Sequence, residues 1–295
     1  MVPNAPGSGY DITARAVATA LDASEIRRGV EVFNLPGGGG VVGLHRLVSE
    51  RGNAALTMLM GLGLIGARLT ATGAPAFTGV TPVARLVEDP EVIVVTRDSP
   101  LLTLADLIAA WTADPQRLRI GGGSSPGGPD HLATMLVAQA MGIAPAKVSY
   151  ARYDGGGALL AAILAKRVGC AVSSLGEYAA QVDSGQLRVL GVTSAVRAPG
   201  LAAPTLREAG VDVEFANWRG LLAPPGLTDA DRAALTALVE QLHTAPSWTQ
   251  ATTSHRWSDA YLAGEAFGAF LAAEDARVTR VLLDLGLTPS VTPAG

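Results

Sequence analysis

The chain has 295 residues, of which 48% are hydrophobic and 16% charged, and its formal net charge is −4. This composition excludes a disordered chain, and the negative charge excludes a general attraction to nucleic acid or anionic membranes. The single cysteine excludes an intrachain disulfide and a cysteine-rich metal site, and the length suits one large or two medium domains.

The N-terminal part begins MVPNAPG, and residues 12–21 and 29–35 read as a helix and a strand. A strand that feeds the first glycine turn should be longer than Met1–Asn4. We therefore expect a leader, and part of that strand, to precede the sequence. No run of about 18 apolar residues is present, so the sequence predicts no membrane span.

Strands and helices then alternate along most of the chain. The pattern predicts a helix at 41–48, strands at 54–60, 80–88 and 91–99, and a helix at 104–111. The strand 117–123 follows, then a helix from Pro129 to before Gly142, strands at 147–153, 168–174 and 187–194, and helices at 158–166 and 175–184. The closing segments are an extended stretch at 213–225, a helix capped by Thr228 and a helix at 267–283. Alternation of this kind predicts mostly parallel sheets flanked by helices, an α/β fold.

Four glycine runs interrupt the pattern where a strand gives way to a helix. They begin at Gly7, Gly37, Gly121 and Gly155, so each pair is separated by about 30 residues, the length of one strand–helix–strand unit. Bare backbone N–H groups and a helix start suit an anion. The repetition predicts two similar lobes that each direct two such turns at a shared cleft.

The chain is expected to cross between these lobes twice. We predict that lobe 1 comprises residues 1–97 and 224–295 and that lobe 2 comprises residues 98–223. The hinge strands are expected near 95–98 and 221–224.

Two short motifs point to enzymes instead. GLGLIG at Gly61–Gly66 matches a dinucleotide fingerprint but lacks a clean acidic residue about 20 positions further on, so an ordinary strand end is favoured. GSSPG places Ser125 in a GxSxG pattern, yet Pro126 has no N–H to give to an oxyanion. Catalytic residues are therefore not predicted, and neither is a cofactor.

Other polar residues have structural alternatives. His131, in the first turn of its helix, should be neutral and should orient the loop 124–128. Asp11 has the position of a helix cap. Arg152 and Arg219 are each either ligand-facing or plain surface residues. The scattered histidines predict no metal site.

Taken together, the runs APGSGYDITARA, NLPGGGGVVG, GGGSSPGGPDHLA, RYDGGGALLAAILAKRVGCAVSS and NWRGLLAPPGL resemble the substrate-binding proteins of tripartite tricarboxylate transporters, the TctC-like or Bug receptors. The resemblance covers nearly the whole chain. It implies a two-lobed, periplasmic-binding-protein (Venus flytrap) fold without enzymatic activity.

The resemblance also implies a set of ligand-binding residues. Two positions depart from the family pattern: Asp154, where many relatives have lysine or an uncharged residue, and Gly61-Leu62, where relatives often have a polar side chain. The implied contacts are Pro6, Gly7, Ser8, Gly9, Tyr10, Asp11, Gly38, Gly39, Gly40, Gly61, Ser124, Ser125, Gly128, His131, Asp154, Gly155, Gly156, Ser173 and Ser174.

The function implied is capture of a small carboxylate, a di- or tricarboxylate such as citrate, and its delivery to membrane permease subunits. The protein would be periplasmic or otherwise extracytoplasmic, exported and in some cases lipid-anchored, and monomeric. Two alternatives stay open: a nucleotide-dependent oxidoreductase or other enzyme on a doubly wound sheet, and a sensor that signals to a kinase.

Overall fold

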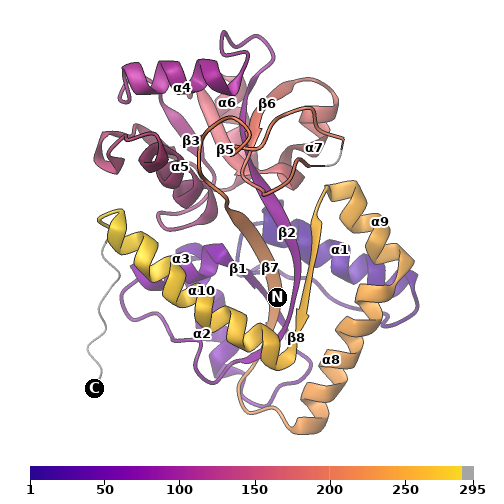
Figure 1. Ribbon diagram of the computed structural model, residues 1–295. Coiled ribbons are helices and arrows are strands. Elements are labelled where there is room, and N and C mark those ends of the chain that lie inside the picture. The colour runs from indigo at the N-terminus through magenta and orange to yellow at the C-terminus, as the bar shows by residue number, and fades with distance from the viewer. Residues whose placement is uncertain (199, 288–295) are drawn as a thin grey trace. The chain divides into compact units, whose positions relative to one another are not determined.

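In the computed structural model, which describes residues 1–198 and 200–287, the chain forms two units. Unit 1 is Met1–Glu88 with Trp218–Gly295, and unit 2 is Asp89–Asn217. The chain passes between them in β2 (Thr81–Thr96) and in β7 (Ala216–Ala223) (Figure 1). The hinge positions expected from the sequence lie further along these same two strands, and the hinge role stays a prediction. Pro199 and residues 288–295, the end of the expected lobe 1, lie outside the described residues.

The sheet of unit 1 is built mainly from distant segments. In it β1 (Met58–Gly61) pairs antiparallel with β7, β7 neighbours β2, and β2 pairs antiparallel with β8 (Ser258–Ala263). The α-helices in the described part of this unit are α1 (Gly9–Ala23), α2 (Val41–Ser49), α3 (Leu62–Thr70), α8 (Asp229–Thr244), α9 (Pro246–His255) and α10 (Gly264–Asp284). A short 3₁₀ turn, η1 (Gly38–Gly40), precedes α2.

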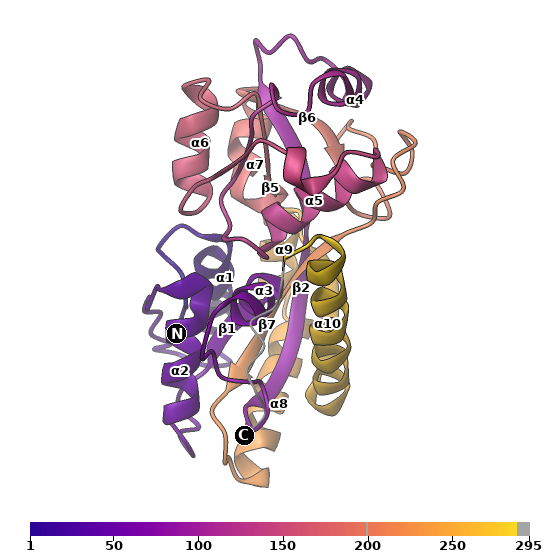
Figure 2. The same cartoon turned by 90° about the vertical axis from the view of Figure 1, so that its left-hand side faces the viewer.

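Alternate residues of these strands face opposite layers, as the two-residue period of a strand requires. Leu59 and Leu221 belong to the core cluster formed with residues of α1 and α8. Trp218, one residue position out of phase, donates its indole N–H to Glu274 of α10 at 2.8 Å and packs edge-on against Phe267. Figure 2 shows α1 and α10 on the two sides of this sheet.

The sheet of unit 2 has a parallel centre. Here β3 (Ile120–Gly122) pairs in parallel with β4 (Tyr150–Arg152) and with β5 (Cys170–Ser174). β2 pairs antiparallel with β5 and with β6 (Leu187–Val192). The helices are α4 (Leu104–Ala113), α5 (Pro129–Ala140), α6 (Gly156–Leu164) and α7 (Leu175–Asp183), with the 3₁₀ turn η2 (Pro145–Lys147).

Several local predictions are confirmed. Pro129 occupies the first turn of α5, and Thr228 caps α8 through a reciprocal pair of bonds with Asp231. The single cysteine, Cys170, is buried, and burial raises its thiol pKa to about 12. Within the described residues, no helix has the length and apolar character needed to cross a membrane.

Two predictions about strands are wrong. The strands expected at 80–88 and 91–99 form one strand, β2, through Asp89-Pro90. Proline is tolerated there because the ladder with β8 ends at Glu88 and that with β5 begins at Glu91, so its missing N–H is not needed. The strand expected at 29–35 is reduced to a single parallel bridge between Val2 and Asn34. The alternation also missed α9 and β8.

Gly61 ends β1 in a place where no side chain fits. A Cβ there would lie 2.3 Å from the carbonyl oxygen of Trp218, a backbone atom that cannot rotate away. Gly61→Ala should therefore lower the free energy of unfolding by about 1–3 kcal/mol, measured by urea denaturation. Gly157→Ala is the control, because a Cβ there meets open space at a helix start and should be neutral or stabilising. Equal stability of Gly61→Ala and the unsubstituted protein would contradict this packing.

Candidate functional site

Hydrogen bonds to Asp11 hold the backbone turn of the first glycine junction in place. Gly7 N–H and Arg15 Nε both donate to Asp11 Oδ2 at 2.9 Å, and Asn34 Nδ2 donates to Oδ1 at 2.9 Å. Burial alone would raise the pKa of Asp11, but these donors outweigh it and hold the pKa below its usual value. Ser8, the N-cap of α1, accepts the Asp11 N–H. Asp11, for which the sequence predicted a cap position, is thus the centre of a cluster of hydrogen bonds.

Tyr10 and Gly61, both predicted contacts, lie together. The Tyr10 hydroxyl accepts the Leu64 N–H at 3.2 Å, and a Cβ on Gly61 would touch the Tyr10 ring at 3.1 Å. Burial raises the pKa of Tyr10 to about 12. Gly61–Gly66 spans the end of β1 and the start of α3, the ordinary strand end favoured above, and the first glycine of the fingerprint is closed off by Trp218.

A buried cation, Arg219, lies beside the second turn of α1. Arg219 is only 2% exposed, donates to Thr13 Oγ1 at 3.0 Å, and has its guanidinium carbon 5.6 Å from the Trp257 ring centre. Thr13 Oγ1 in turn donates to Gly9 O at 2.8 Å. Of the two arginines weighed from the sequence, Arg219 is therefore buried, while Arg152 is exposed. In the sequence, the run NWRG is the feature that marks Arg219.

The turn of the second junction consists of glycines in conformations that other residues avoid. Gly37, Gly38, Gly39 and Gly40 all have positive φ. The predicted residues Gly38–Gly40 form η1, and a Cβ on Gly40 would come within 3.0 Å of Leu64 in α3. This turn therefore packs close to the helix start that Tyr10 also contacts.

In unit 2, the third junction repeats the design of the first. Gly123 N–H donates to Asp130 Oδ2 at 2.7 Å, and Ser124 Oγ accepts from the N–H groups of Asp130 and His131 at 3.1 and 3.4 Å. The Gly128 N–H donates to the Ser125 carbonyl at 2.7 Å. Ser124 precedes α5, and its hydroxyl accepts hydrogen bonds from N–H groups in the first turn of that helix. Spacing alone did not predict this role.

His131 holds the loop in the way the sequence analysis favoured. Its Nδ1 accepts the Gly127 N–H at 3.3 Å, and its ring meets that of Tyr150 edge-on at 4.9 Å. Burial lowers the pKa of His131 to about 4, so the ring is neutral at physiological pH. Because the Nδ1 lone pair already accepts the Gly127 N–H, that nitrogen does not serve as the base that Ser125 would need.

At the fourth junction, Asp154 is exposed and Gly155 has φ +86° with open space around its α-carbon. The Gly155 N–H donates to Gly123 O at 2.9 Å, which ties the third and fourth junctions together. A Cβ on Gly156 would lie 1.9 Å from Glu177 Oε2. A carboxylate of the protein itself therefore sits against the start of α6.

Sequence reasoning missed a buried acidic cluster beside the predicted Ser173 and Ser174. Glu91 Oε1 accepts from Ser174 Oγ at 3.1 Å and from Asn217 Nδ2 at 2.9 Å. Burial, together with the charges of Asp130 and Asp89, raises the pKa of Glu91 well above its usual value. Burial also raises the pKa of Asp130, to about 6. A glutamate inside a β-strand pattern gives no signal of such a role.

The structure therefore brings the predicted residues of unit 1 together around α1 and α3, and those of unit 2 around α5, α6 and β5. Two α/β units with glycine turns before their helices correspond to the two-lobed periplasmic-binding-protein fold, the fold of solute-binding receptors. This confirms the predicted fold class.

Comparison with known proteins identifies the family. The model of the "Tripartite tricarboxylate transporter family receptor" matches residues 13–287, and the chain belongs to this family. It is 27% identical over 256 residues to the UPF0065 protein in the tcbD-tcbE intergenic region of Pseudomonas sp. (strain P51), covering 85% of this chain and 75% of that protein. It is 27% identical over 242 residues to BugT of Bordetella pertussis, covering 77% of this chain and 70% of BugT.

Two solved structures are similar along nearly the whole chain. That of R. palustris Rpa4515 with adipate is 25% identical, with a TM-score of 0.89 and coverage of 98% of this chain and 97% of that one. That of a TctC solute-binding protein from Polaromonas without ligand is 27% identical, with a TM-score of 0.71 and 96% coverage of both chains. The matched family is a family of receptors and the Polaromonas relative is a solute-binding protein, so the chain is a solute-binding receptor and not an enzyme. The oxidoreductase and hydrolase alternatives are wrong.

The raised pKa of Glu91 has a consequence for stability. Its folded-state pKa lies above the unfolded value, so the protein loses unfolding free energy as the pH rises from about 4.3 through the folded pKa. In Glu91→Gln the amide oxygen still accepts from Ser174 and Asn217, but this loss is absent. We expect Glu91→Gln to be more stable than the unsubstituted protein at pH 8 and to lose that advantage near pH 4.

Urea denaturation at both pH values measures the difference. Glu208→Gln is the control, since that exposed carboxylate has a lowered pKa and its removal gains nothing at pH 8. Identical pH dependence of Glu91→Gln and the unsubstituted protein would show that Glu91 ionises freely in the folded state.

Proposed function

We propose that this receptor captures a small dicarboxylate or tricarboxylate through the glycine junctions of its two units. The observation that carries the proposal is the similarity to the adipate-bound relative along 98% of the chain. Adipate is a dicarboxylate, so a dicarboxylate is the first candidate, and citrate is the tricarboxylate to compare with it.

Local electrostatics support an anionic ligand in unit 1. The start of α1 carries the partial positive charge of a helix N-terminus, and the buried Arg219 donates a hydrogen bond to Thr13 in the second turn of the same helix. The Asp11 carboxylate is already satisfied by three donors, so it orders the turn and its charge is partly neutralised. The set of contact residues named from the sequence is retained as part of this proposal.

In unit 2 the buried charged groups are acidic. Asp89, Glu91 and Asp130 are buried there, and an anion would be repelled if all three were charged. The raised pKa values of Glu91 and Asp130 reduce that charge. Hydroxyl groups such as that of Ser125 can then donate to a ligand carboxylate without a buried cation nearby.

Delivery is the second part of the proposal. A receptor of this family would hand the carboxylate to the permease subunits of a tripartite transporter, acting as an exported, periplasmic or extracytoplasmic monomer. Closure around the ligand at the crossings in β2 and β7 would select a state already present as a minor population.

Thermal unfolding against a panel of mono-, di- and tricarboxylates, amino acids and NAD tests the ligand class. A ligand at a hundred times its Kd stabilises the folded protein by about 2.7 kcal/mol. We expect a rise in Tm with adipate-like dicarboxylates or with citrate, and none with NAD. A response to amino acids alone, or to no acid in the panel, would overturn the carboxylate proposal.

Ser125→Ala tests the glycine junction of α5. Its hydroxyl is half-buried, and its backbone carbonyl, which the substitution retains, is the group that accepts the Gly128 N–H. We expect about a threefold to tenfold loss of affinity by calorimetry, the value of one hydrogen bond, with unchanged stability. Ser184→Ala, at the C-cap of α7, is the matched control and should bind normally. Unchanged affinity in Ser125→Ala would remove this hydroxyl from the site.

A further inference from the structure

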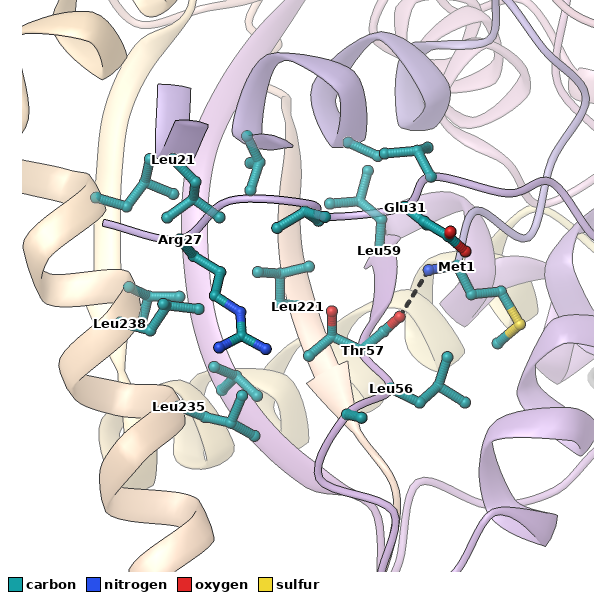
Figure 3. Close-up of a pocket in the computed structure, with 18 of the residues that line it drawn as sticks. Met1, Leu21, Arg27, Glu31, Leu56, Thr57, Leu59, Leu221, Leu235 and Leu238 are labelled. Atoms are coloured by element: carbon teal, nitrogen blue, oxygen red, sulfur yellow. Dashed lines mark hydrogen bonds between the residues drawn. The ribbon is translucent and has the colours of Figure 1, made fainter. Parts of the chain in front are cut away.

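Unit 1 has an apolar slot that offers little to a carboxylate. The slot has a volume of about 570 Å³ and opens between the segments 29–33 and 54–57 and the helices α1 and α8 (Figure 3). Its walls are mainly aliphatic, among them Val17, Leu21, Leu59, Leu221, Leu235 and Leu238. An ionised carboxylate is not stabilised against such walls, because it loses its water without gaining hydrogen-bond donors. Buried polar atoms in unit 2 give a better indication of where one binds.

Glu91 lies at the edge of the unit 2 sheet where the glycine junctions begin. The strands β3, β4 and β5 run parallel, and the turns at 123–128 and 154–156 follow the carboxyl ends of β3 and β4. β2 runs antiparallel to β5, and Glu91 pairs with Ser174, the last residue of β5. Ligands of open α/β sheets bind outside the carboxyl ends of the parallel strands. Glu91 therefore lies at the edge where a ligand of unit 2 is expected.

The two carboxyl oxygens of Glu91 have different surroundings. Oε1 accepts from Ser174 Oγ at 3.1 Å and from Asn217 Nδ2 at 2.9 Å. Oε2 is buried and has no hydrogen-bond partner among the described residues. An oxygen that accepts two hydrogen bonds has the role of the carbonyl oxygen of a neutral carboxylic acid, whose other oxygen carries the proton. The O–H group of a protonated Glu91 therefore lies at Oε2, as a buried donor that still needs an acceptor.

The groups around Glu91 keep it protonated. Its pKa is raised well above the usual value, first by burial and then by the charges of neighbouring carboxylates, and the hydrogen bond from Asn217 only partly opposes this. The titratable groups that act on Glu91 come from β2, α5, α7 and β4, and they are Asp89, Asp130, Glu177, Tyr178 and Tyr150. Each of these groups is an acid or a phenol, so none of them favours the ionised form of Glu91.

We propose that Glu91 is a further ligand-binding residue of unit 2, and that its Oε2–H donates a hydrogen bond to an ionised carboxylate of the ligand. This role rests on the carboxylate function proposed above. Ser174 and Asn217 position the group through Oε1. A hydrogen bond from a carboxylic acid to a carboxylate is charge-assisted and stronger than one between neutral groups. The buried acid thus binds an anion instead of repelling it, as long as it keeps its proton.

Calorimetric titration with adipate at several pH values tests this role. Between about pH 7 and about pH 9 both carboxylates of adipate are ionised. Asp130, whose pKa burial raises to about 6, is ionised in the same range. In the unsubstituted protein the affinity should fall as the pH rises through the folded-state pKa of Glu91, by up to about tenfold per pH unit, because the ionised side chain has no proton to donate. Glu91→Gln should bind adipate throughout this range without such a fall, since its amide N–H replaces the O–H.

Two further variants separate the donor from the charge. Glu91→Met has no donor and should lose roughly tenfold in affinity at about pH 7, the value of a hydrogen bond to a charged group. Glu91→Gln keeps the two bonds to its oxygen, so the test stands even if Glu91→Met does not fold. Glu208→Gln removes an exposed carboxylate of the same unit and should retain the pH dependence of the unsubstituted protein.

Three results would contradict the role of Glu91. Parallel pH profiles of the unsubstituted protein and Glu91→Gln, each binding adipate, would overturn it. They would leave the proton within the protein, for example on Asn217 Oδ1, which is also buried without a partner in the part of the chain that the structure describes. Unchanged affinity of Glu91→Met would overturn it as well. Absence of binding by both adipate and citrate at every pH would instead overturn the carboxylate function on which this role rests.

Discussion

A buried aspartate in the first turn of a helix, bonded back to the glycine turn before it, is the interaction on which the first and third glycine junctions depend. Asp11 accepts the Gly7 N–H, and Asp130 accepts the Gly123 N–H. Glycine permits the tight turn, but ordering a glycine on folding costs more conformational entropy than ordering any other residue. The hydrogen bonds to the carboxylate offset that cost and fix the turn at the helix start. Backbone N–H groups at a helix start are suited to binding an anion.

Because these hydrogen bonds are local, the starts of the helices could be predicted from the sequence. The buried cluster around Glu91 could not. Glycine, proline and capping residues act locally, so Pro129 and Thr228 give the starts of α5 and α8 directly. The cluster around Glu91 joins β2, β5 and β7, residues far apart in sequence. Only the pairing of those strands brings them together, and no local pattern encodes that pairing.

The same distinction explains the error at Asp89-Pro90. Proline normally ends a strand, and the local rule therefore predicted two strands. The rule fails because a strand that changes partners has positions where no ladder bond is required. β2 changes from β8 to β5 at this dipeptide, so the proline is accommodated without loss. The exception thus marks the place where the chain leaves one unit for the other.

The segment 29–35 and the first glycine junction are linked through Asn34. Its side chain donates to Asp11 Oδ1 at 2.9 Å and to Asn4 O at 3.0 Å, and its backbone lies in the bridge with Val2. A shift of the segment 29–35 by one residue would turn every side chain to the other face and withdraw Asn34 from Asp11. The geometry of the Gly7 turn therefore depends on the backbone pairing of Asn34 with Val2, outside the turn itself.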